Sequence, residues 1–197
     1  MARTLGSALL VLGMAIQGAY ASEQCSQIQS NSDRLACYDL QYKPAVSQAK
    51  KSAWNVSESQ SKMDDSKTVV LHVESDEQIR KSFGGSETAD LYIRCQEGKT
   101  SLYFVIADRF LATVEGYGKV DYRLDSEKPR SQEMDVSTDN KALGLWGASA
   151  ISFAKKLVGH DSLVVRVTPY NESPVTATFK IAGLDEALKP LRAVCKW

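Results

Sequence analysis

The sequence has few histidines and no excess of charge. Only two of its 197 residues are histidine, His72 and His160, and 24 basic residues balance 24 acidic ones. Because no basic block interrupts this balance, the chain lacks the electrostatic signal of nucleic-acid or anionic-lipid binding. Neither histidine lies near a cysteine pair, and no C-x-x-C motif is present, so zinc-binding spacing is missing too. We therefore expect no nucleic-acid partner, no metal and no cofactor.

Motifs of the common enzyme classes are also missing. No G-x-S-x-G elbow accompanies the histidines, so nothing indicates a serine hydrolase. The glycine turns at residues 84–85 and 116–118 are not followed by the Lys-Ser/Thr of a phosphate-binding loop. The acidic residues at 64–65 lack the ligand spacing of a calcium loop. We expect no catalytic residue, although spacing alone does not reveal two facing carboxylates of the kind that a glycosidase uses.

Long apolar runs are absent except near the N-terminus. Arg3 precedes an uncharged apolar stretch at residues 5–15, and Ala19-Tyr20-Ala21 follows it. A basic start, a short apolar run and an A-x-A site are typical of a signal peptide, and this run is too short for a stable membrane span. We therefore predict export, removal of residues 1–21 by cleavage after Ala21, and no membrane span in the remaining chain.

Cysteine is scarce, but its number is informative. The four cysteines are Cys25, Cys37, Cys95 and Cys195, and an even number in an exported chain predicts disulfides. Of the three possible connectivities we favour Cys25–Cys37, within one N-terminal segment, and Cys95–Cys195, from a central strand to the last helix. In the chain-entropy model the long bridge contributes about 4–5 kcal/mol and the local bridge about 3 kcal/mol.

Composition divides the exported chain into two parts. Residues 22–45 are polar with few apolar anchors, and they predict two short helices stapled by Cys25–Cys37. Pro44 stops the helical pattern, and the polar residues 46–52 are typical of a linker. Alternation of apolar and polar residues begins after this linker, which predicts a β-sandwich-like domain over residues 53–197.

Period-two alternation predicts six or seven short strands in this domain. We expect loops at residues 57–66 and 75–88, because both stretches are polar. His72 is expected on the solvent side of a strand, and His160 in a loop after a helix. The strand patterns cover residues 54–56, 69–73, 91–95, 100–107, 120–124, 163–167 and 175–181, with residues 131–137 pairing weakly.

Two segments of the domain have a helical pattern. Residues 140–160 predict one internal helix that Ser149 caps and Gly159 ends. The chain then closes with a β-hairpin and a helix that places Leu184, Leu188 and Leu191 on one stripe. The predicted fold is mainly β: an antiparallel β-sandwich or open barrel with one internal helix, a C-terminal helix and a small disulfide-stapled helical N-terminal segment.

An ordered set of short motifs extends over most of the exported chain, and it resembles the VasI family, also called TagO, of type VI secretion-associated proteins. That resemblance implies an exported accessory protein in the envelope of a Gram-negative bacterium. The motifs are Cys25, Arg34-Leu35, Cys37-Tyr38-Asp39, Trp54, residues 91–95, residues 120–125, residues 165–170, Phe179, Gly183-Leu184 and residues 192–197.

Together with the signal peptide, the cysteine pattern and the β-domain pattern, the resemblance favours a periplasmic protein without enzymatic activity that binds envelope proteins of a type VI secretion apparatus. It supplies no catalytic residues. Arg94 and Arg123, in two of the strand motifs, are a candidate interaction face. Two alternatives stay open: a cell-wall-acting enzyme or its regulator, and a periplasmic immunity or inhibitor protein. Neither the partner nor the oligomeric state follows from the sequence.

Overall fold

The computed structural model describes residues 25–42, 52–81, 84–112 and 117–197. Two compact units divide the chain, residues 1–48 and residues 49–197, and each is described on its own. The predicted signal peptide and most of the predicted linker lie outside the described residues. No helix in the described ranges is long and apolar enough to cross a membrane.

The N-terminal unit contains helix α2 (Asn31–Tyr42), and before it residues 25–26 are also helical. A disulfide between Cys25 and Cys37 ties this short helical segment to α2, and this is the predicted pairing. Arg34 supports the same junction, because its Nη1 donates a hydrogen bond of 2.9 Å to the carbonyl of Ile28. A unit this small cannot bury a sizeable core, so a covalent tie is an expected source of its stability.

One antiparallel sheet of nine strands, in the order β1-β2-β5-β6-β9-β8-β7-β10-β11, dominates the second unit. A second sheet pairs two short strands, β3 (Ile79–Arg80) and β4 (Ser86–Glu87). The nine strands are β1 (Asn55–Gln60), β2 (Lys67–Glu74), β5 (Ala89–Gln96), β6 (Lys99–Ile106), β7 (Tyr117–Leu124), β8 (Arg130–Val136), β9 (Ala142–Trp146), β10 (Ser162–Val167) and β11 (Val175–Lys180).

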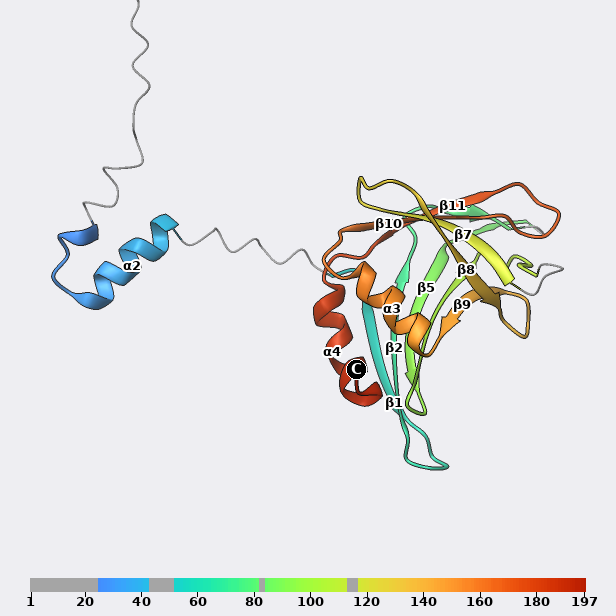
Figure 1. Cartoon of the computed structure of the whole chain (residues 1–197), viewed down its shortest axis with the longest axis horizontal. Coiled ribbons are helices and arrows are strands. Elements are labelled where there is room, and N and C mark those ends of the chain that lie inside the picture. The colour runs from blue at the N-terminus through green and yellow to red at the C-terminus, as the bar shows by residue number, and fades with distance from the viewer. Residues whose placement is uncertain (1–24, 43–51, 82–83, 113–116) are drawn as a thin grey trace, which may run out of the picture. The chain divides into compact units, whose positions relative to one another are not determined.

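The large sheet curls so that its last strand returns toward β2 (Figure 1). Ser75, just after β2, forms a single bridge with Phe179 in β11. Inside the curve the rings of Phe104 and Phe179 lie 5.9 Å apart. Because one bridge is not a continuous ladder, the barrel is not closed. The prediction of a mainly antiparallel β fold is confirmed.

Alternation along the strands places the core on the inner face of the curve, where two helices cover it. Helix α3 (Ala148–Leu157) packs against β6 and β9, and α4 (Leu184–Cys195) packs against β2 and β5. The Nζ of Lys155 is 5.6 Å from the ring centroid of Trp197, so α3 lies beside the end of α4 (Figure 1). Each large apolar side chain buried here contributes roughly 1.5–3 kcal/mol.

The C-terminal segment is tied to the rest of the domain at several points. The predicted disulfide Cys95–Cys195 joins β5 to the last residue of α4. The indole of the terminal Trp197 donates a hydrogen bond of 2.8 Å to the hydroxyl of Thr100. Between β11 and α4, the carbonyl of Ile181 accepts a hydrogen bond of 3.2 Å from the indole of the buried Trp54. These contacts bring both ends of the domain onto the sheet.

The predicted internal helix over residues 140–160 is wrong in its first part. Residues 142–146 form the strand β9, between β6 and β8. Gly147, with φ 59°, separates the strand from α3, and it occupies the N-cap position predicted for Ser149. The run Ala142–Trp146 is almost wholly apolar, so it has no alternation, and such a run does not distinguish a buried strand from a helix.

Three other segments differ from the prediction, and the strands outnumber the six or seven expected. Residues 57–60, expected in a loop, extend β1, an edge strand whose exposure on both faces removes the alternation signal. Strand β8 pairs with β7 from Arg130 to Asp135, which is more than the weak pairing expected. The loop expected at residues 75–88 contains β3 and β4.

Candidate interaction surface

Three side chains form a stack across the outer face of the sheet, which points away from the core. His72 is the register partner of Tyr92, and Tyr92 is that of Tyr103. The first two rings are 4.5 Å apart and 13° from parallel, and the second two are 5.0 Å apart and 20° from parallel. The facing sides of these rings therefore cover one another. His72 lies on the predicted face, but its side chain is only 24% exposed.

The next strand after β6 is β9, where Gly144 is the register partner of Tyr103 and continues the row. Trp146 lies two residues further along β9, on the same face. A Cβ atom on Gly144 would lie 2.6 Å from the indole of Trp146 and 2.9 Å from Cβ of Tyr103, so the indole covers the bare backbone there. Trp146 still keeps 44% of its surface exposed. An exposed indole held in place by its surroundings is a typical anchor for protein recognition.

Arg94 lies on the same face, next to this row. Its guanidinium carbon is 5.7 Å from the ring centroid of Tyr103, which is a cation–π contact. Its Nε is buried without a hydrogen-bond partner, and so is the hydroxyl of its register partner Ser101. Within the described ranges Arg94 has no ion pair. We call Arg94, Ser101, Tyr103 and Trp146 the aromatic–arginine surface.

The phenol groups of this face stay neutral. Burial raises the pKa of Tyr103, against a smaller opposite effect of the charge on Arg94. Burial, and after it the charge on Asp90, raises the pKa of Tyr92. Both hydroxyls therefore remain able to donate and accept hydrogen bonds. A cation, an indole and neutral phenols make up the composition that marks the energetic centre of protein interfaces.

The second predicted interaction residue, Arg123, lies elsewhere on the sheet. It belongs to β7, and the strands β6, β9 and β8 lie between β7 and the β5 strand of Arg94. Arg123 lines a shallow hollow with Asp121 and Arg166. Hydrogen bonds from Ser131 first and Arg166 second hold the pKa of Asp121 below its usual value. The two predicted arginines therefore lie on strands that are not neighbours, at two separate places on the sheet.

His160 has a structural partner in Asp125. Its Nδ1 is 2.8 Å from one carboxylate oxygen of Asp125, and the other oxygen accepts hydrogen bonds from the backbone N–H groups of Asp161 and Ser162 at 3.0 and 2.9 Å. The bond from His160, and after it those backbone bonds, lower the pKa of Asp125. The pair therefore fixes the loop between α3 and β10 to the end of β7, and His160 lies in a loop as expected.

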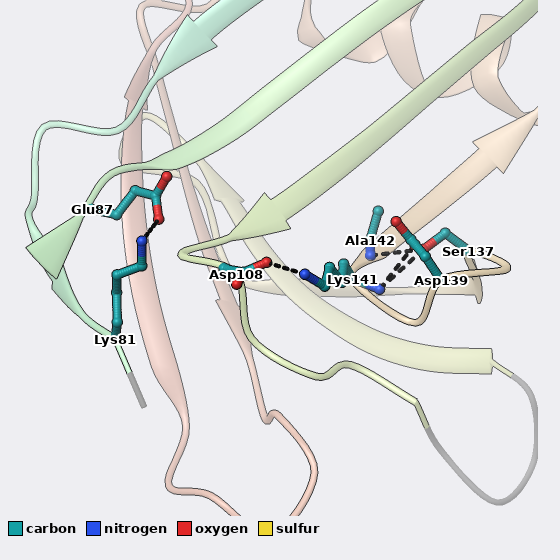
Figure 2. A network of polar contacts seen from close by, with 7 residues as sticks. All are labelled: Lys81, Glu87, Asp108, Ser137, Asp139, Lys141 and Ala142. Atoms are coloured by element: carbon teal, nitrogen blue, oxygen red, sulfur yellow. Dashed lines mark hydrogen bonds and ion pairs between the residues drawn. The ribbon is translucent and has the colours of Figure 1, made fainter. Parts of the chain in front are cut away.

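A polar network occupies one loop-rich end of the domain (Figure 2). Lys81 meets Glu87 at 2.7 Å, and Lys141 meets Asp108 at 2.6 Å. The bond to Glu87 raises the pKa of Lys81, and the bond between Asp108 and Lys141 lowers the pKa of the acid and raises that of the base. Exposed pairs of this kind contribute little to stability.

Two exposed aromatic residues lie near the same end. The rings of Phe110 and Tyr170 meet edge to face at 6.1 Å, and 50% and 54% of their surfaces are exposed. An ion pair between Arg109 and Glu172 joins the same two loops. Here the two rings are each other's neighbours, and among the described residues the nearby Arg109 is already paired with Glu172. This end is thus a weaker candidate for recognition than the aromatic–arginine surface.

Sequence reasoning found Arg94 but missed most of its surroundings. Tyr103 and Trp146 come from different strands, and the strand that carries Trp146 was expected to be helical. The alternation of residues 91–95 and 100–107 did place Tyr92 and Tyr103 on the polar face of their strands. A register between those strands could therefore have brought the two tyrosines together, but not Trp146.

Comparisons with known proteins place the chain in a family. A model of the family described as type VI secretion system VasI, EvfG matches residues 24–197. No curated protein sequence matches the chain significantly. Among solved structures, the chain is similar to invasion associated protein B from Bartonella henselae, with a TM-score of 0.48 and 15% identity over 74% of this chain and 96% of that one. The match over residues 24–197 covers most of the sequence, and the chain therefore belongs to the VasI family of type VI secretion system proteins.

Proposed function

We propose that this protein is a periplasmic, non-enzymatic accessory component of a type VI secretion system, and that it binds another envelope protein through the aromatic–arginine surface. Family membership provides the link to type VI secretion. The signal-peptide pattern of residues 1–21 supports export. The two disulfides support it as well, because disulfides persist in oxidising compartments such as the periplasm.

The binding proposal rests mainly on Arg94, a charged side chain without an ion-pair partner among the described residues. Its guanidinium packs over Tyr103, and its buried Nε has no hydrogen-bond partner. A carboxylate from a partner would form a charge-assisted pair with the Nη groups of this guanidinium. Trp146, on the same face and separated from Arg94 by Ser101 of the strand between them, offers an exposed apolar anchor. The surface therefore fits a protein segment that presents an acidic side chain next to an apolar one.

The contacts of His160 indicate a structural role for that residue. Its ring lies 2.8 Å from Asp125, and the same carboxylate accepts hydrogen bonds from two backbone N–H groups of a loop. His72 lies 2.8 Å from Asp90 in the other His–Asp pair. The surface that we propose for binding carries no residue of either pair.

A complementation experiment tests the proposal. In a strain that lacks this gene, we expect reduced effector secretion and sheath assembly, restored by the wild-type protein. The variants Arg94→Ala and Trp146→Ala should restore neither, although their periplasmic levels match wild type. Phe110→Ala is the matched control, because Phe110 is an aromatic residue of similar exposure at another site, and it should restore secretion. Unchanged secretion in the deletion strain would contradict the accessory role.

Crosslinking would then identify the partner. A photoreactive amino acid at position 146 should capture one envelope protein, and the same amino acid at position 110 should not. Adding Arg94→Ala should reduce the captured amount. The variant Arg123→Ala shows whether the contact extends across the sheet to β7.

Two other assays distinguish the alternative functions. A cell-wall enzyme would release fragments from purified peptidoglycan, whereas we expect none from this protein. An immunity protein would protect cells from one toxin and leave secretion unchanged, whereas we expect the reverse pattern.

A further inference from the structure

We propose that His72, Glu74 and Asp90 form a binding site for a divalent transition-metal ion, with Zn²⁺ as the best-suited candidate. The site lies on the outer face of β2 and β5. His72 and Glu74 are two residues apart on β2 and therefore point to the same side, and Asp90 is the register partner of Glu74. One ligand atom from each residue lies within 4.8 Å of the other two. This site is separate from the proposed function and does not depend on it.

The donor atoms have suitable chemistry and spacing. One imidazole nitrogen and two carboxylate oxygens are ligands that Zn²⁺ accepts, at bond lengths of about 2.0–2.2 Å. Ligand atoms around such an ion are roughly 3–3.5 Å apart. The Nε2 of His72 and Oδ1 of Asp90 are already 2.8 Å apart, so small side-chain rotations would complete the arrangement. Three protein ligands leave a position for water, as in an open zinc site.

The ring of His72 is held in place before any ion binds. It stacks on Tyr92 at 4.5 Å, with the planes only 13° apart. The side chains of His72 and Asp90 are 24% and 19% exposed, which limits their rotamers further. Two of the three proposed ligands are therefore held by their surroundings, and a ligand fixed in this way loses little conformational freedom on binding.

The charges around the site favour a cation. Glu74 and Asp90 lie directly opposite each other on adjacent strands, and like charges in that position destabilise a sheet. Within the described ranges neither carboxylate has a lysine or arginine partner, and Asp90 pairs only with His72. Asp76 differs from them, because Lys180 neutralises it at 2.7 Å. A bound divalent ion would offset the repulsion that the sheet otherwise leaves in place.

An ion can reach the site from solvent. A surface hollow of about 450 Å³ opens beside it, and its lining includes His72 and Glu74 together with Asn55, Ser75 and Asp76. The simpler interpretation is a hydrogen bond between His72 and Asp90 without a metal. That interpretation accounts for two of the three residues, but it leaves the position of Glu74 opposite Asp90 unexplained.

Titration calorimetry with ZnCl₂ on the metal-free, untagged exported chain at neutral pH tests the proposal, and we expect saturable binding of one ion. His72→Phe keeps a ring to stack on Tyr92 but removes the nitrogen ligand, and it should weaken Zn²⁺ binding at least ~10-fold. Glu74→Gln should weaken binding similarly. Two controls should bind as wild type: Asp76→Asn, from the same hollow, and His160→Phe, from the other His–Asp pair.

Thermal unfolding supplies a second readout that a purely structural role would not produce. Zn²⁺ should raise the unfolding temperature of the wild-type protein, because a ligand of the folded state stabilises it. Glu74→Gln removes a like-charge contact, so without metal it should unfold at the same or a higher temperature, yet it should gain less from Zn²⁺. The proposal is overturned if Zn²⁺ does not bind saturably, if His72→Phe binds as wild type, or if His160→Phe loses as much affinity as His72→Phe.

Discussion

Cys95 and Cys195 form a disulfide that joins the middle of the large sheet to the end of the last helix, across 100 residues of sequence. Cys95 is fully buried on the inner face of β5, and α4 packs on β2 and β5 above it. The bridge therefore holds the helix onto the sheet that it covers. Because the loop is so long, the bridge removes much of the conformational freedom of the unfolded chain.

We predict that the double variant Cys95→Ala/Cys195→Ala lowers the free energy of unfolding by about 4–5 kcal/mol. Urea unfolding followed by tryptophan fluorescence measures this, because all three tryptophans lie in residues 49–197. The matched control is Cys25→Ala/Cys37→Ala, which opens a loop of sequence separation 12 in the other unit. That control should leave the tryptophan transition in place. Equal shifts in the two variants would contradict the prediction.

Gly144→Ala should destabilise the protein by about 1–3 kcal/mol, as overpacking does. The new methyl group would meet the Trp146 indole at 2.6 Å and Cβ of Tyr103 at 2.9 Å. We expect a changed fluorescence spectrum and a lower urea midpoint. In a Trp146→Ala background the same substitution should cost less, because the indole is gone, and this double-mutant cycle isolates the contact. Equal costs in both backgrounds would show that the indole does not lie over Gly144.

Asp125→Asn should lower stability at neutral pH by about 1 kcal/mol, since it weakens three hydrogen bonds at a partly exposed site. Asparagine tolerates the left-handed backbone of this residue, with φ 44°, so the change mainly removes charge. The folded-state pKa of Asp125 is lowered from its ordinary value of 3.8. The stabilisation is therefore complete above that value and is lost as the pH falls through the lowered folded-state pKa.

Urea unfolding of the wild type and Asp125→Asn at a series of pH values checks this sign. The difference in unfolding free energy should be largest near neutral pH and should shrink in acid. A difference that stays constant from neutral to acidic pH would refute the role of the charge.

Ser137→Ala should destabilise the start of β9 by about 1–2 kcal/mol. The Ser137 hydroxyl oxygen accepts hydrogen bonds from the backbone N–H groups of Lys141 and Ala142 at 3.2 and 2.9 Å (Figure 2). Hydrogen exchange of the β9 amides should accelerate in the variant. Asp108→Asn, in the same exposed network, is the control and should leave both exchange and the urea midpoint unchanged.

The sequence predicted much of this fold because its signals are local. Alternation within residues 91–95 and 163–167 identified strands, and the leucine stripe of residues 184–191 identified the last helix. These signals failed where the two faces of a strand do not differ in burial or polarity. The apolar run of β9 and the fully exposed β1 are the two examples.

The sequence by itself determined the class of fold and indicated the family, and it favoured the disulfide pairing that the structure contains, since each depends on residue type and order along the chain. Only the tertiary structure decided which side chains meet on the outer face of the sheet. The register between β2, β5, β6 and β9 brings Arg94 to Tyr103 and Glu74 to Asp90, and it sets Arg123 apart. Register between strands distant in sequence depends on how the whole core packs, and for that reason both proposed sites became visible only in the folded molecule.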